Sequence, residues 1–163
     1  MSTLALTRRA ALGALVAAPV GAAFGQPDVR FRDIVVDVRA PVGDPTVAWL
    51  QQELPGAIAQ ALGPDYAPGD RSGATLVARI DYVYLGPSSG GTGPAGASQD
   101  TIKGALIVRG PRGGVDLPLR AISFYYPMAV DQALPEQAYH DRVTALAQAF
   151  AGWVPRKLRL AQG

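Results

Sequence analysis

Few side chains in this sequence are suited to catalysis. The 163 residues contain one histidine, His140, and no cysteine. Without cysteine these residues hold no thiolate metal site, iron–sulfur cluster, disulfide, cysteine nucleophile or lipid-modified cysteine. One histidine is too few for a histidine-rich metal centre. We therefore expect no metal site and no cofactor.

His140 is the first candidate for a general base, because imidazole titrates near neutral pH. No serine or thiol nucleophile pattern accompanies it, so the sequence indicates no catalytic triad. His140 lies one residue from Tyr139 and off the apolar stripe of the last predicted helix. That position favours a solvated histidine on a helix over a catalytic one. We name no catalytic residue and expect a non-enzymatic protein.

Acidic and basic side chains alternate along the predicted strands. They share one face of the sheet: Asp33, Asp37, Arg79, Asp81, Lys103, Arg109, Asp116 and Arg120. Two acids across a cleft could hydrolyse a glycosidic bond. Acids interleaved with bases on an open sheet are, however, what cross-strand ion pairing produces. We favour an ion ladder, and keep a small hydrolase or carbohydrate-active enzyme that uses these carboxylates as an alternative.

Aromatic residues supply the best candidate for a binding surface. Tyrosine and phenylalanine are favoured in protein interfaces. The candidates are Tyr82, Tyr84, Phe124, Tyr125 and Tyr126. The competing interpretation is that these rings close one end of the hydrophobic core.

Four strands and two helices must position these residues. Alternation of apolar and polar side chains predicts strands over 29–39, 75–85, 101–109 and 115–126. In the second strand it puts Tyr82 and Tyr84 on the same side as Ile80, opposite Val83. Pro118 predicts that the fourth strand is an edge strand or carries a bulge.

Apolar residues three or four positions apart predict the two helices. The first begins at Asp44-Pro45 and ends at Gly63-Pro64, and Pro55 predicts a kink or break near Glu53. The second begins at Pro135 and ends at Pro155. Its predicted apolar stripe is Tyr139, Val143, Leu146, Phe150 and Trp153.

The order of these elements is β-α-β-β-β-α. It predicts an α+β fold of two layers: a four-stranded, mostly antiparallel sheet with two helices on one face. We assign residues 26–163 to one domain, with a flexible loop at 86–100 rich in glycine and serine. The topology is similar to that of small periplasmic accessory domains of cell-envelope assembly systems.

The first 25 residues have the pattern of a cleavable export signal. Arg8 and Arg9 precede an apolar run, and Ala23-Phe24-Gly25 offers small residues for cleavage after Gly25. Cleavage after Ala22 is the second choice. Thr7-Arg8-Arg9 resembles a twin-arginine signal, although Ala11 stands where such signals usually carry a large apolar residue. General secretion is the alternative route.

Export changes the charge balance of the chain. The full sequence has 15 basic and 13 acidic residues, and loss of Arg8 and Arg9 leaves 13 of each. A domain without net positive charge binds nucleic acid poorly, because non-specific binding depends on that charge. We therefore expect a periplasmic or secreted binding domain with a protein or envelope partner and no transmembrane span in its mature part. A small-ligand carrier, with its pocket between the sheet and the kinked first helix, is a further alternative.

Overall fold

The computed structural model describes residues 29–43, 45–87, 93–110 and 113–161. The four strands form one sheet in the order β1-β2-β3-β4. They are β1 (Phe31–Val38), β2 (Ala74–Leu85), β3 (Ser98–Gly110) and β4 (Gly113–Tyr125). β1 pairs with β2 in parallel, and the other two pairs are antiparallel. The predicted α+β architecture is confirmed.

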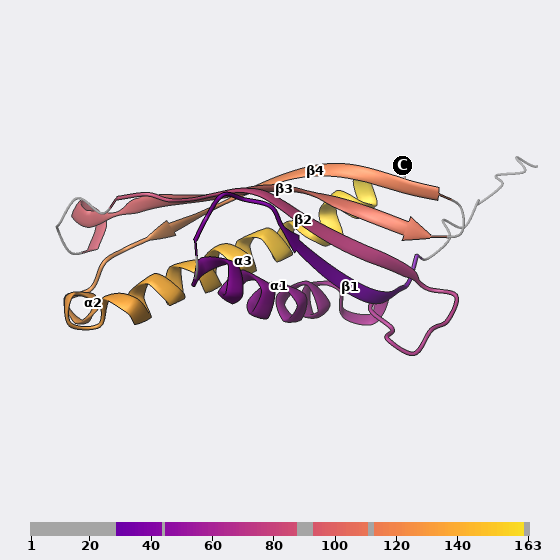
Figure 1. The fold of residues 1–163 in the computed structure, drawn as a ribbon, viewed down its shortest axis with the longest axis horizontal. Coiled ribbons are helices and arrows are strands. Elements are labelled where there is room, and N and C mark those ends of the chain that lie inside the picture. The colour runs from indigo at the N-terminus through magenta and orange to yellow at the C-terminus, as the bar shows by residue number, and fades with distance from the viewer. Residues whose placement is uncertain (1–28, 44, 88–92, 111–112, 162–163) are drawn as a thin grey trace, which may run out of the picture.

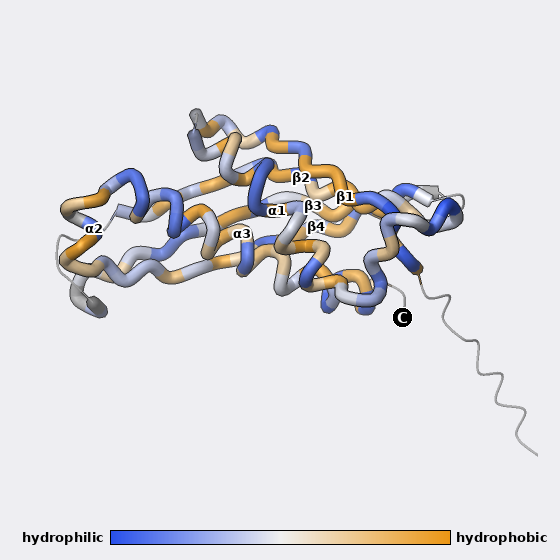
Figure 2. The backbone as a smooth tube through the Cα atoms, turned by 90° about the horizontal axis from the view of Figure 1, so that it is seen from below, coloured by the Kyte–Doolittle hydropathy of each residue, from blue (hydrophilic) through white to orange (hydrophobic). Residues whose placement is uncertain are grey.

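The two long helices lie on one face of the sheet (Figure 1). They are α1 (Thr46–Leu62) and α3 (Pro135–Leu160), and they lie side by side in front of the strands in Figure 2. Their apolar stripes and the inner sides of the strands form the core. Its largest fully buried side chains include Phe150, Leu50, Leu54, Ile58 and Leu106. The opposite side of the sheet, here called the open face, is covered by neither helix.

α1 connects the two parallel strands as a single helix. Of the kink or break predicted near Glu53, the break does not occur, although Pro55 lies inside the helix. Leu54 and Ile58 flank Pro55 and are fully buried, so packing offsets the hydrogen bond that proline removes. Pro45 precedes the first helical residue rather than being it, and the predicted cap residue Asp44 lies outside the described residues. Gly63, at φ +55°, ends α1 before the short 3₁₀ helix η1 (Gly63–Asp65), as predicted.

A β-bulge interrupts β2 and reverses the side chains that follow it. Ile80 lies opposite Gly104 and Tyr82 lies opposite Lys103, so Asp81 is the extra residue. The predicted strict alternation is therefore wrong beyond Ile80. Val83 joins the core, whereas Tyr82 and Tyr84 are exposed. Gly104 is required here, because a Cβ atom at this position would overlap the carbonyl oxygen of Arg79.

β4 is an edge strand without a bulge. Its register with β3 runs from Gly113 to Tyr125 without a shift, so the edge alternative for Pro118 is the correct one. β3 begins at Ser98, earlier than predicted. The connection between β2 and β3 therefore ends before Ser98, and it includes the 3₁₀ helix η2 (Gly93–Gly96). The predicted loop end at residue 100 is wrong.

The last helix is longer than predicted. α3 continues through Pro155 to Leu160, because Val154 and Leu158 anchor its last turns in the core. The predicted stripe is correct at Val143, Leu146 and Phe150, but Tyr139 and Trp153 are exposed. A short helix that the sequence did not predict, α2 (Ala129–Ala133), precedes α3. Within the described ranges, no helix is both long and apolar enough to cross a membrane.

Candidate functional site on the open face of the sheet

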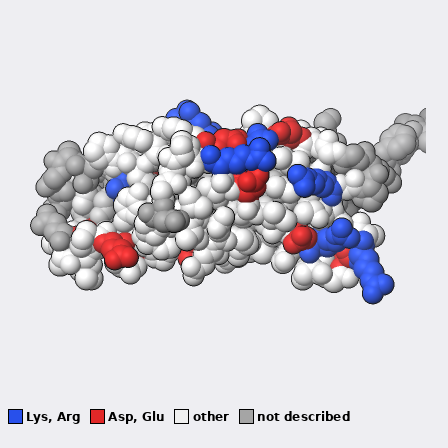
Figure 3. All heavy atoms as spheres, viewed as in Figure 1, with Lys and Arg blue, Asp and Glu red and all other residues white. Residues whose placement is uncertain are grey.

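The open face has two halves of different chemistry, separated by the bulge at Asp81. The charged half consists of Asp37, Arg39, Arg79, Asp81 and Asp116. Figure 3, which views the sheet from its edge as Figure 1 does, shows blue and red spheres next to one another over the middle of the molecule, and fewer of them toward the end that carries α2. At that end the open face carries exposed aromatic and aliphatic side chains.

Arg79 organises the charged half. Its Nε donates to both carboxylate oxygens of Asp81, at 2.9 and 3.1 Å, and its Nη1 donates to Asp116 at 3.3 Å. The hydrogen bond to Asp81 raises the pKa of the Arg79 guanidinium above its ordinary value. Arg39 forms a separate pair with Asp37 at 2.8 Å. The pairs include four members of the predicted ion ladder, Asp37, Arg79, Asp81 and Asp116. Within the described residues, the other four, Asp33, Lys103, Arg109 and Arg120, belong to no ion pair.

This arrangement favours a structural role for the carboxylates over glycoside hydrolysis. Asp81 and Asp116 share one arginine, and both side chains are well exposed to water. An acid that protonates a leaving group needs a raised pKa, which burial usually provides. Neither Asp81 nor Asp116 is buried in this way. Within the described residues, no group of three histidine or acidic side chains could hold a metal ion.

The second half of the open face carries what we call the aromatic patch: Tyr82, Tyr84, Ile122 and Phe124. Tyr84 and Ile122 flank Thr101 in one row across the sheet, and Tyr82 lies two residues before Tyr84. Phe124 continues the patch along β4, opposite Gln99. Tyr84 is 47% exposed and Phe124 60% exposed. Several large exposed apolar side chains at one end of a sheet face point to a contact with another molecule.

The structure brings together three of the five predicted aromatic residues. Tyr82, Tyr84 and Phe124 share the open face, whereas Tyr125 points to the helix side of the sheet. The competing interpretation, a cap on the core, therefore describes Tyr125 better than the other rings. Tyr126 follows the end of β4 and is exposed. It lines a hollow of about 200 Å³ together with residues that include Tyr125, Met128 and Asp131.

Beneath the aromatic patch lies a buried ion pair. Arg142 on α3 contacts Asp100 on β3 through two nitrogens, Nε at 3.1 Å and Nη2 at 2.5 Å. Nη2 also donates to the carbonyl oxygen of Gly86 and to Ser98 Oγ, and Asp100 accepts a hydrogen bond from the Gly86 N–H. The side chain of Asp100 is 1% exposed and that of Arg142 is 11% exposed. The pair fixes the end of the β2–β3 hairpin to α3.

Tyr125 belongs to the same polar cluster. The Arg142 guanidinium lies over its ring at 4.8 Å, and its hydroxyl donates to Asp131 Oδ2 at 2.5 Å. Desolvation first, and then the hydrogen bond to Asp131, raise the pKa of Tyr125 to about 12. The backbone N–H of Met128 and the Tyr125 hydroxyl lower the pKa of Asp131. The cluster thus orders the turn between β4 and α2.

Sequence reasoning missed this cluster, because Asp100 was assigned to the flexible loop. A signal was present in α3: Arg142 lies four residues after Ala138 and four before Leu146, on the buried stripe. A charged residue at such a position indicates a buried partner, since an unpaired buried charge is too costly.

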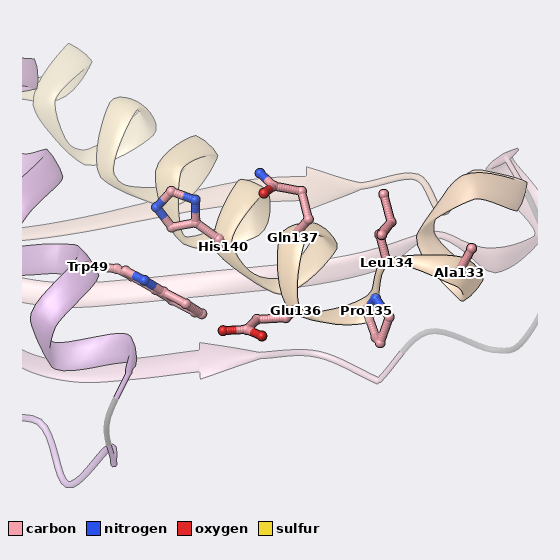
Figure 4. A pocket seen from close by; sticks show the side chains of 7 residues that line it. All are labelled: Trp49, Ala133, Leu134, Pro135, Glu136, Gln137 and His140. Carbon is pink, nitrogen blue, oxygen red and sulfur yellow. The ribbon is translucent and has the colours of Figure 1, made fainter.

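His140 lies at a groove between α1 and α3, not on a fully solvated surface as predicted. Its ring is 4.9 Å from the Trp49 ring, and Nε2 is 3.6 Å from Glu53 Oε1. The groove has a volume of about 530 Å³, and Figure 4 shows the Glu136 carboxylate directed toward Trp49. Among the described residues that line this groove, none is a serine, threonine or cysteine that could act as a nucleophile. It is also not the pocket predicted for a carrier, because fully buried Leu50 and Ile58 fill the space between α1 and the sheet.

Comparison with known proteins gives similarity in structure only. No family model and no curated protein matches the sequence. Among solved structures, a minor lipoprotein from Acinetobacter baumannii has 12% identity and a TM-score of 0.41, covering 77% of this chain and 94% of that one. Rare lipoprotein B from Shewanella oneidensis has 8% identity and a TM-score of 0.36, covering 79% and 98%. An uncharacterized protein has 16% identity and a TM-score of 0.44, covering 82% and 90%. Likeness at this level establishes neither a family nor a function.

Proposed function

We propose that this chain is an exported, non-enzymatic domain of the cell envelope that binds another protein through the aromatic patch. The observation that carries the proposal is the exposure of Tyr82, Tyr84, Ile122 and Phe124 at one end of the open face. Aromatic side chains are over-represented among the residues that dominate binding energy. A sheet face with this composition gains stability when a partner removes it from water.

The alternatives explain these features less well. A carrier needs an enclosed apolar cavity, and the space between α1 and the sheet is filled by side chains. A hydrolase needs two carboxylates with different surroundings around a cleft, whereas Asp81 and Asp116 share one arginine on an open surface.

Export is supported by the sequence of the first 25 residues, which lie outside the described part of the chain. Replacement of Arg8 and Arg9 together by lysine is expected to leave the precursor in the cytoplasm if the twin-arginine route is used. Cell fractionation and N-terminal sequencing of the wild-type protein test this directly, with Gln26 as the expected first residue. Normal export of the double-lysine variant would favour general secretion. A wild-type protein found only in the cytoplasm would contradict the proposal.

Binding through the patch is tested by site-specific photo-crosslinking in the cells that make the protein. A photoreactive residue is placed at Tyr84, at Phe124 or, as the control, at Trp153 on α3. Trp153 is matched to Tyr84 in exposure, at 45% against 47%, but lies on the opposite layer. We expect the same cross-linked protein from both patch positions and not from position 153. Equal products from all three positions, or none from the patch, would contradict the proposal.

A further inference from the structure

The outer edge of β4 carries backbone hydrogen-bonding groups that point away from the sheet. Pro118 has no N–H, and proline in a sheet takes positions whose N–H would face outward at an edge. The register with β3 has no shift, so residues an even number of positions from Pro118 share its orientation. The outward N–H and C=O groups beyond Pro118 are therefore those of Arg120, Ile122 and Phe124.

The same three residues present their side chains on the open face. Ile122 and Phe124 belong to the aromatic patch, and all three side chains are exposed. Side chains two positions apart on a strand are separated by about 7 Å. A strand added along this edge would place every second side chain beside Arg120, Ile122 and Phe124. Backbone pairing and side-chain packing would thus occur at one place.

Arg120 also has an unfavourable neighbour. It lies directly opposite Lys103 in the register of β3 and β4. Like charges directly opposite each other destabilise a sheet. Within the part of the chain that the structure describes, neither cation belongs to an ion pair, and Lys103 Nζ lies 4.9 Å above the Tyr82 ring. In the charged half, by contrast, Arg79 and Arg39 each contact a carboxylate.

We infer that an acidic, extended segment of a partner protein adds to the sheet as a fifth strand along residues 119–125 of β4. Its aspartate or glutamate lies beside Arg120, and apolar residues at alternate positions lie beside Ile122 and Phe124. The carboxylate offsets the repulsion between Arg120 and Lys103. This inference rests on the proposed function and names the mode of binding at the same patch.

A peptide strand fits this surface better than an anionic membrane. A lipid headgroup supplies negative charge but does not pair with the alternating N–H and C=O groups of an edge strand. An added strand cannot receive a hydrogen bond from Pro118, so we place it along the residues that follow Pro118. These residues form the edge of β4 that ends at Tyr125, next to the patch.

The test uses the purified exported protein and a short synthetic peptide in which glutamate, isoleucine and phenylalanine alternate with threonine. Hydrogen exchange of individual amides is followed by NMR. We expect the peptide to slow exchange at the amides of Arg120, Ile122 and Phe124. The amides of Leu119 and Ala121 already pair with β3 and serve as an internal control. A peptide with lysine in place of glutamate is expected to bind at least about tenfold more weakly, the factor given by one modest charge interaction.

Two pairs of variants test whether the peptide binds along this part of β4. Arg120→Gln is expected to weaken binding about tenfold, whereas Arg109→Gln, which removes a cation at the far end of β3, leaves it unchanged. Ile122→Pro removes one outward N–H and is expected to abolish binding, and Ile122→Thr, which keeps that N–H, retains part of it. Equal binding by the glutamate and lysine peptides, or binding insensitive to Arg120→Gln, would overturn the inference.

Vesicles separate this inference from its competitor and from the proposed function. If vesicles rich in phosphatidylglycerol protect the β4 amides and the glutamate peptide does not, the surface is one for membranes and the inference is wrong. If cross-links from Tyr84 and Phe124 to one protein persist while that protein leaves the β4 amides unprotected, the inference fails and the proposed function stands. Absence of those cross-links would remove the proposed function itself.

Discussion

The two halves of the open face have opposite chemistry, and they also differ in strands: β1 pairs with β2 only as far as Ile80, so the charged half has four strands and the aromatic half has three. In the charged half, Arg79 reaches two carboxylates, and Ala105 beside it in the sheet is buried. In the other half, Tyr84 and Phe124 are exposed, and two cations lie opposite each other in the strand register. In the charged half, the five charged side chains that define it pair with one another. The aromatic half presents apolar surface and like charges together, which is the condition that a partner can relieve.

The bulge at Asp81 marks the boundary between the halves. One inserted residue turns Tyr82 and Tyr84 from the core side to the open face and admits Val83 to the core. β-Bulges are often found where a side chain must be redirected at a functional site. A single local irregularity therefore places Tyr82 and Tyr84 on the face that the proposed function assigns to a partner.

The largest effect is expected from breaking the ion pair beneath the aromatic half. Asp100→Ala leaves the Arg142 guanidinium buried without its carboxylate, so the free energy of unfolding should fall by about 3–5 kcal/mol. Chemical denaturation monitored by circular dichroism measures the change. Asp116→Ala, in the charged half, is the control and should cost no more than about 1 kcal/mol. Similar losses from both variants would contradict the assignment of Asp100 as buried support.

A smaller effect is expected at the boundary itself. Gly104→Ala places a Cβ atom against the Arg79 carbonyl oxygen, so the bulge must shift, at a cost of about 1–3 kcal/mol. The same variant should alter NMR shifts of Tyr82 and Tyr84 more than those of Val77. Gly152→Ala, on α3, is the control, because a Cβ atom added there would meet no neighbouring atom within 4 Å. An unchanged spectrum and stability for Gly104→Ala would show that the boundary does not depend on this close approach.

Within the charged half, a single substitution should matter little. Arg79→Gln removes the contacts with Asp81 and Asp116, yet both carboxylates are well exposed, so we expect only a small fall in stability. Thermal unfolding at low and high salt measures it, and the difference between wild type and variant should shrink as salt screens the charges. A fall as large as that expected for Asp100→Ala would mean that the charged half is a structural centre rather than a solvated ion cluster.

The Tyr125 phenol should change stability with pH only in the alkaline range. Because the folded-state pKa of Tyr125 is raised from 10.0 to about 12, the folded state holds the phenol proton more tightly than the unfolded chain does. The resulting stabilisation is complete below pH 10 and is lost as pH rises toward 12. Tyr125→Phe should therefore differ from wild type less at pH 12 than at pH 9, as measured by denaturant unfolding. A constant difference across this interval would contradict the raised pKa.

Much of the fold could be predicted from the sequence because each element carries a repeating pattern. Alternation located β1, and spacings of three and four located α1 and the middle of α3. Prolines proved weaker helix breakers than their local effect suggests: α1 is continuous through Pro55, so the break alternative there is wrong, and Pro155 does not end α3. In both cases buried neighbours such as Ile58 and Leu158 hold the helix, and such tertiary packing is not visible in a local pattern.

The candidate site could be predicted only in part. Composition singled out Tyr82, Tyr84 and Phe124, but alternation assigned the first two to the wrong side, since a bulge leaves no clear mark in a single strand. Asp100 was assigned to the loop because glycine and serine precede it, and its buried role depends on Arg142, 42 residues away. The repulsion between Lys103 and Arg120 depends on strand register, which the sequence alone did not fix.

The central claim is that the aromatic half binds and the charged half does not. The direct measurement is photo-crosslinking from Phe124 in three backgrounds: wild type, Tyr82→Ser with Tyr84→Ser, and Arg39→Ser with Arg79→Ser. We predict that the cross-linked protein disappears in the tyrosine double variant and persists in the arginine double variant, with all three proteins folded by circular dichroism. Loss of the product only in the arginine double variant would contradict the claim and move the binding site to the charged half.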